Sequence, residues 1–222
     1  PMTEDFETVK AVRKEDARLK SRIRRLRILS RTISLLISIA ILIPIALTVH
    51  KFLSTRTTLR TILHPDGTST TRTAWAKDSK TWPTYMYFAT AATAVLLNGS
   101  IIFSYKCGVQ QANRASNVAS VFSWAVLVGN LVVWSVAAGL YRSEKDKGGK
   151  SNDLWGWTCS PAARAIQKEF VKEVNFERFC NVQSVSFYIG IVQVVAALLS
   201  IVIYVLALFR RSTKKKIQKQ AK

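Results

Sequence analysis

The chain has 222 residues, of which 49% are hydrophobic, and a formal net charge of +20. The hydrophobic residues come in long blocks, which excludes an ordinary soluble domain and predicts membrane spans. So high a charge would indicate a nucleic-acid binder in a soluble chain, but here 10 of the 33 Lys and Arg residues precede Thr32 and 7 follow Phe209. Both ends flank apolar blocks, so the expected counter-charge is anionic lipid, and we expect no nucleic-acid partner.

Residues 1–31 form a basic segment with a helical pattern. Leu19, Ile23 and Leu26 recur at helical spacing among four arginines, Arg22, Arg24, Arg25 and Arg27. The pattern predicts a basic amphipathic helix that lies on the inner leaflet, with its arginines on the lipid headgroups. A solvated helical lead-in to the first span explains the same pattern equally well.

Four apolar runs are long enough to cross a bilayer, which takes about 20 residues. Within a membrane domain of residues 32–209, the expected spans cover about residues 32–52, 83–105, 117–140 and 184–209. The last run stops at a basic tail, residues 210–222, which we expect to be disordered and to place Lys214, Lys215 and Lys216 on the headgroups. Because Lys and Arg are retained on the cytoplasmic side, we predict an all-α, four-transmembrane-helix bundle with both termini in the cytoplasm.

Polar residues inside the predicted spans are few. Asn98, Asn130 and Gln193 are expected to hydrogen-bond between helices, since such residues serve this purpose more often than ligand binding. Small residues at four-residue spacing, among them the pairs Ser135/Gly139 and Ser186/Gly190, predict close helix approach within the bundle or against partners.

Between the first two spans, residues 57–75 are rich in threonine. They surround the sequence His64-Pro65-Asp66-Gly67, a turn signal between two β-prone runs. We therefore predict a small β-hairpin outside the membrane.

The loop between the last two spans has the most specific sequence. Ser160 as N-cap and Pro161 at the first helical position begin a helix that the apolar spacing of Ile166, Phe170 and Val174 extends to Val174. That helix advances about 21 Å, and an extended return of about 20 Å brings Cys180 back to Cys159. On the oxidising side these cysteines are expected to form a disulfide, with two free buried thiols as the alternative.

The same loop contains the motif Leu154-Trp155-Gly156-Trp157-Thr158-Cys159. We expect Trp155 and Trp157 to pack on the disulfide or to lie at the outer membrane interface. Stacking against a ligand is the less favoured alternative.

The run from Asp153 to Cys159, with Phe179-Cys180-Asn181-Val182-Gln183 before the last span, resembles a group of ascomycete fungal tetraspan proteins similar in layout to MARVEL-domain proteins. The resemblance implies a protein of the plasma membrane or secretory pathway that organises membrane or accompanies larger assemblies, without enzymatic activity. The chain departs from tetraspanins because its large loop lacks Cys-Cys-Gly. It departs from claudins because its Trp/Cys motif lies in the second external loop.

Residue patterns for chemistry are missing from the sequence. It has no paired carboxylates, no nucleophile–base pair and no metal-ligand spacing, so we expect no catalytic residues, metal or cofactor. The first hypothesis is a scaffold or membrane organiser, the second an accessory subunit of a larger transporter, pump or synthase, and the third an oligomeric pore lined by Ser, Thr and Asn. The expected partners are anionic lipids of the inner leaflet and either further copies of the chain or a larger membrane complex.

Overall fold

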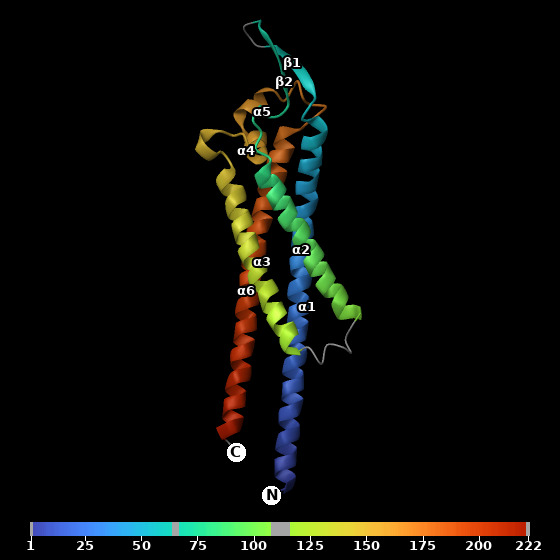
Figure 1. Cartoon of the computed structure of the whole chain (residues 1–222), viewed down its shortest axis with the longest axis vertical. Coiled ribbons are helices and arrows are strands. Elements are labelled where there is room, and N and C mark those ends of the chain that lie inside the picture. The colour runs from blue at the N-terminus through green and yellow to red at the C-terminus, as the bar shows by residue number, and fades with distance from the viewer. Residues whose placement is uncertain (1, 64–66, 108–115, 221–222) are drawn as a thin grey trace.

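The computed structural model describes residues 2–63, 67–107 and 116–220. Its long helices, which lie side by side (Figure 1), are α1 (Met2–Thr55), α2 (Trp82–Cys107), α3 (Ser116–Glu144) and α6 (Phe176–Gln220). The segments long and apolar enough to cross a membrane are Ile28–Thr55, Trp82–Phe103, Trp124–Gly149 and Phe176–Leu206. The prediction of a mostly helical chain with four candidate spans is confirmed, and it indicates an integral membrane protein.

Helices α1 and α6 both continue far beyond their apolar segments. α1 joins the basic N-terminal segment to the first span without a break at Pro44, and its 54 residues extend about 81 Å. A helix lying on the leaflet would need a bend before the span, so α1 fits the helical lead-in better. α6 continues to Gln220, so the expectation of a disordered tail is wrong; Lys and Gln there are good helix formers. Both termini lie at the same end of the molecule (Figure 1).

The buried side of each long helix follows alternating steps of three and four residues. An average step of about 3.5 residues keeps one side of a helix against its neighbours in left-handed packing. Here α1 packs on α2 and α6, and α3 packs on the same two helices. The repeat is clearest in α1, at Arg31, Ser34, Ser38, Ile41, Ile45, Thr48, Phe52 and Thr55, and in α6, at Gln183, Ser186, Gly190, Gln193 and Ala197.

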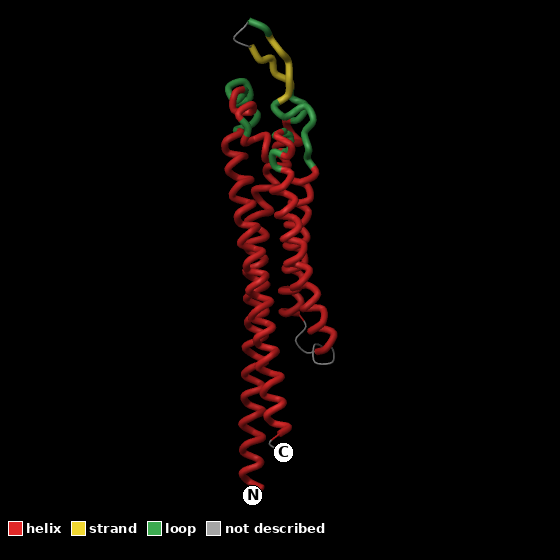
Figure 2. The backbone as a smooth tube through the Cα atoms, turned by 90° about the vertical axis from the view of Figure 1, so that its left-hand side faces the viewer, coloured by secondary structure: helices red, strands yellow, loops and turns green. Residues whose placement is uncertain are grey.

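The remaining elements gather at the end opposite the termini, where they form what we call the head, residues 56–63, 67–81 and 145–175 (Figures 1 and 2). It contains strands β1 (Leu59–Leu63) and β2 (Ser69–Thr73) and the short helices η2 (Lys147–Gly149), α4 (Leu154–Cys159) and α5 (Pro161–Ala165). The strands pair antiparallel with Thr61 opposite Thr71, which confirms the predicted hairpin. Residues 64–66 of its turn lie outside the described residues.

The helix predicted from Pro161 to Val174 is wrong beyond Ala165. The Gln167 amide donates to the carbonyl of Val174 and accepts from the backbone N–H of Phe176, both at 2.8 Å. These bonds let the side chain replace helical backbone bonds, and residues 166–173 form turns instead. Ile166, Phe170 and Val174 are still buried together, as their spacing predicted.

Candidate functional site

A disulfide closes the head. Cys159 at the end of α4 is bonded to Cys180 near the start of α6, with the two Cα atoms 4.9 Å apart. The predicted bridge is therefore confirmed. It fastens α4 to the last span and holds both ends of the segment between the two cysteines.

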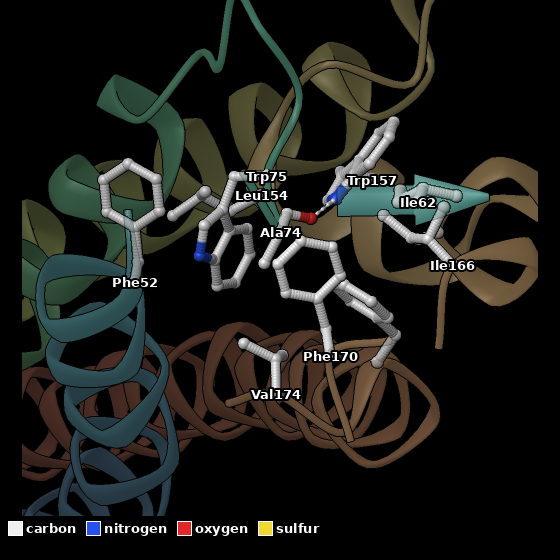
Figure 3. Packing of buried hydrophobic residues seen from close by; sticks show 11 residues of the cluster. Phe52, Ile62, Ala74, Trp75, Leu154, Trp157, Ile166, Phe170 and Val174 are labelled. Carbon is white, nitrogen blue, oxygen red and sulfur yellow. Dashed lines mark hydrogen bonds between the residues drawn. The ribbon is translucent and has the colours of Figure 1, made fainter. Parts of the chain in front are cut away.

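The head has a hydrophobic core of its own (Figure 3). The ring of Trp75 meets Phe52 of α1 edge-on at 5.1 Å and Phe176 of α6 at 6.3 Å. Its indole N–H donates to the Thr55 hydroxyl at 2.9 Å, and the Trp157 indole donates to the carbonyl of Ala74 at the same distance. These contacts join the hairpin, α1, α4 and α6 into one packed unit.

The local sequence explains why α4 begins where it does. Asp153 is its N-cap: one carboxylate oxygen accepts from the N–H of Gly156 at 2.9 Å, and the other accepts from the N–H of Asp146 at 3.3 Å. A Cβ at position 156 would collide with the carboxylate of Asp153, so the motif needs glycine there. Burial raises the pKa of the Asp153 carboxyl, and its backbone hydrogen bonds oppose that shift.

Trp155 joins the head to the spans. Its ring stacks on Tyr141 of α3 at 5.0 Å, and Tyr141 stacks on Tyr87 of α2 at 4.5 Å. The indole N–H donates to the Ser184 hydroxyl of α6 at 3.0 Å, and the Lys145 ammonium lies 4.5 Å from the ring centre. Trp155 and Trp157 are both buried with their N–H groups bonded, so they serve packing and do not form an open platform for a ligand.

Gln183, fully buried in α6, is a second link between head and spans. Its carbonyl oxygen accepts from the Tyr141 hydroxyl at 3.1 Å, and its amide donates to the Thr158 hydroxyl at 3.0 Å. One side chain thus joins α3, α4 and α6. Replacing it would remove both of these hydrogen bonds, each worth about 0.5–1.5 kcal/mol.

Four buried side chains form a polar cluster between the helices, on the side of the termini. Its members are Arg31, Ser34, Asn98 and Gln193, and we refer to them below as the polar cluster. The Asn98 amide donates to the carbonyl of Ala94 at 2.8 Å and to the Ser34 hydroxyl at 3.5 Å; the Gln193 amide also donates to Ser34. Asn98 and Gln193 therefore meet at α1, so the cluster joins α1, α2 and α6. Asn130 is half-buried in α3 and makes no side-chain hydrogen bond to the described residues.

Arg31 is a buried charged residue of the polar cluster that the sequence analysis missed, because it placed the first span after this position. The side chain is 5% exposed and donates to the Asn98 side-chain oxygen at 3.4 Å. Asn98 lies 16 residues into α2 from Trp82, about 24 Å along the helix, which is inside a hydrocarbon core of about 30 Å. The spacing of Arg31 with Ser34 and Ser38 on one helix face was the available signal.

The arginines and lysines predicted to contact headgroups both lie close to the ends of apolar segments. Arg22, Arg24, Arg25 and Arg27 precede Ile28 in α1 by about 2–9 Å, and Lys214–Lys216 follow Phe209, the last residue of the apolar run in α6, by about 8–11 Å. The headgroup layer is about 5–8 Å thick on each side. Counted along the helix axis, both groups therefore lie within this layer or just beyond it.

Metal-ligand chemistry finds no support in the described part of the chain. No group of three or more His, Cys, Asp or Glu residues there is placed to hold a metal ion.

A family model matches residues 2–222 of the chain. The chain belongs to this family, described as a domain of unknown function, DUF8762. Searches of curated proteins and of solved structures found no match. The match covers the basic ends, the spans and the head together.

Proposed function

We propose that this DUF8762 chain is a non-enzymatic scaffold or membrane organiser of the plasma membrane or secretory pathway. The observation that carries the proposal is that the buried polar side chains hydrogen-bond between elements of the chain. Asn98 and Gln193 bond to Ser34 of another helix, and Gln183 bonds to Thr158 of the head. Polar groups used in this way fix the arrangement of helices. Together with the disulfide and the core of the head, they give a rigid unit suited to holding partners in place.

The proposed topology is a four-helix bundle with the head outside and both termini in the cytoplasm. Disulfides persist in oxidising compartments, which supports an external head. The basic residues of the two termini lie at the other end of the molecule, and Lys and Arg are retained in the cytoplasm.

A second candidate, an accessory subunit of a larger complex, has an observation of its own. Ser135 and Gly139 of α3 are exposed, and a Cβ added at Gly139 would meet no atom within 4 Å. By contrast, Ser186 and Gly190 of α6 are buried within the chain. The outward pair offers a close approach to a helix from another chain. The oligomeric pore is the third candidate. Its lining would need polar side chains that face other copies of the chain, whereas Ser34, Asn98 and Gln193 bond to one another inside a single chain.

Native mass spectrometry in mild detergent tests these candidates. We expect the scaffold to be a lone chain or a small homo-oligomer; a fixed ratio with a foreign subunit would support the accessory subunit, and a closed ring that conducts ions would support the pore.

If the exposed pair Ser135 and Gly139 mediates association, Gly139→Leu should dissociate the complex because leucine blocks helix approach. Val133→Leu, at an exposed position about 120° away around the same helix, is the control and should leave the complex intact. Equal association of both variants would exclude this contact.

We also propose that the arginine group contacts anionic headgroups, with about 1 kcal/mol from each residue at low salt. In the full chain, changing Arg22, Arg24, Arg25 and Arg27 to Gln should reduce the number of anionic lipids retained in native mass spectra. Changing Lys214, Lys215 and Lys216 to Gln should also reduce it, because these lysines follow the apolar run of α6 closely. Equal retention by wild type and both variants would mean that these charges act only during insertion.

A further inference from the structure

The β-hairpin has two chemically different faces. Side chains alternate between faces along a strand, so Arg60, Ile62 and Arg72 share one face. Ile62 is buried in the core of the head, the Arg72 guanidinium lies 5.1 Å from the ring centre of Trp157, and Arg60 pairs with Glu173, lowering the pKa of that carboxyl. This face is therefore fixed against the head.

The opposite face carries hydroxyl groups and points to solvent. It contains Thr61 opposite Thr71 and Leu63 opposite Ser69, and all four are exposed. Among the described residues, the Thr61 and Thr71 hydroxyls hydrogen-bond only to each other, at 3.4 Å, and Ser69 makes no side-chain hydrogen bond. No carbonyl in the described part of the hairpin therefore holds these hydroxyls, and their exposed side chains can be reached by an external partner.

The backbone around these hydroxyls is equally accessible. In the described part of the chain the sheet has two strands, so each strand has one edge that no described strand pairs with, and the hairpin extends beyond the rest of the head (Figure 2). The strands hold the chain extended, the form in which an enzyme can bind it as a further strand. The hydroxyls therefore lie on a protruding, extended segment.

The compartment of the hairpin follows from its contact with the disulfide-bearing loop. The Trp157 indole donates to Ala74, one residue beyond β2, and Cys159 lies two residues after Trp157. The hairpin and the disulfide are therefore on the same side of the membrane, the oxidising one. Ser- and Thr-rich segments on that side are typical carriers of O-linked sugars.

We propose that the outward face of the hairpin is an O-glycosylation site, with the hydroxyls of Thr61, Ser69 and Thr71 as acceptors. The inference rests on the proposed external position of the head. The co-substrate is a sugar carried on a phosphate. The hydroxyl oxygen attacks the anomeric carbon and forms the glycosidic bond, the bond to the phosphate oxygen breaks, the phosphate leaves with the electron pair, and a base of the transferase takes the proton.

Peptide mass spectrometry of the full chain, purified from a eukaryotic secretory host, tests the proposal. Trypsin cleaves after Arg60 and Arg72, so residues 61–72 are released as one peptide. We expect this peptide to carry one or more sugars, mapped to Thr61, Ser69 or Thr71. The triple variant Thr61→Val, Ser69→Ala, Thr71→Val should lose them, and valine keeps the β-branched shape that suits a strand.

The control variant, Thr90→Val with Thr93→Val, changes one half-buried and one exposed threonine of α2 within its apolar segment and should keep the sugars. An unmodified peptide 61–72, sugars on other residues only, or phosphate in place of sugar would overturn the proposal. Thiol alkylation of the purified protein tests the oxidising environment of the head, and protease protection of a C-terminal tag in sealed, right-side-out vesicles from the same host tests the topology. A bridged Cys159–Cys180 pair and a protected tag without sugar would reject the site alone, whereas a digested tag would reject the topology as well.

Discussion

Removing the disulfide should lower the free energy of unfolding of the detergent-solubilised protein by about 3 kcal/mol. The bridge joins residues 21 positions apart and so closes a loop whose entropy is restored to the unfolded chain when the bond is lost. The variant Cys159→Ala with Cys180→Ala, followed by chemical or thermal unfolding in one detergent, measures the effect. Tryptophan fluorescence is a suitable signal, because Trp75 and Trp157 are buried in the head that the bridge closes.

The third cysteine provides the control. Cys107→Ala should leave the stability near that of the wild type, and a reductant should destabilise this variant as much as the wild type. Intact-mass analysis after alkylation of the denatured, unreduced wild type should show one modified thiol, at Cys107. Three modified thiols, or equal stability with and without the two paired cysteines, would contradict the prediction.

The parts of the fold that sequence reasoning predicted share a physical basis. The spans follow from the length of the apolar runs, and the hairpin follows from β-prone runs on either side of a Pro-Asp-Gly turn. The disulfide follows from the distance that the chain between Cys159 and Cys180 can cover. Each inference uses local sequence and a length, and none of them requires knowing which elements pack together.

The interior of the spans could not be predicted in the same way. A helix in lipid is apolar on its inner and outer sides, so hydrophobic periodicity does not identify the buried face. Leucines such as Leu36 and Leu198 face outward, whereas Arg31, Ser34 and Gln193 face inward. In soluble proteins apolar residues mark the buried face of a helix. Here the buried face is marked instead by small and polar residues at steps of three and four.

The head shows a different limit. The spacing of Ile166, Phe170 and Val174 correctly identified residues that are buried together. Either a helix or a series of turns can bury these three side chains, so the spacing alone does not distinguish the two. The Gln167 side chain decided between them, because it binds the backbone of Val174 and Phe176, nine residues or fewer away. Such a long side-chain bond depends on the closed loop and leaves no local pattern in the sequence.

Gly190→Ala should destabilise the protein by about 1–3 kcal/mol, the usual effect of overpacking. Gly190 is buried in α6, and a Cβ there would collide with the Tyr87 hydroxyl and lie 3.1 Å from the ring carbon that bears it. Tyr87 cannot easily move away, because it stacks on Tyr141 and meets Trp134 edge-on at 5.7 Å. Unfolding of the purified variant in the same detergent measures the loss.

Tyr87→Phe should partly rescue Gly190→Ala, because it removes the colliding oxygen and leaves the ring in place. Alone, Tyr87→Phe should cost about 0.5–1.5 kcal/mol, since the hydroxyl donates to the carbonyl of Ser186 at 3.2 Å. The double variant should therefore lose less stability than the sum of the single variants, which a double-mutant cycle detects. Gly129→Ala in α3, where a Cβ meets no atom within 4 Å, should show no loss. Additive losses in the cycle would mean that Gly190 and Tyr87 do not meet, and that α2 and α6 pack differently in the membrane.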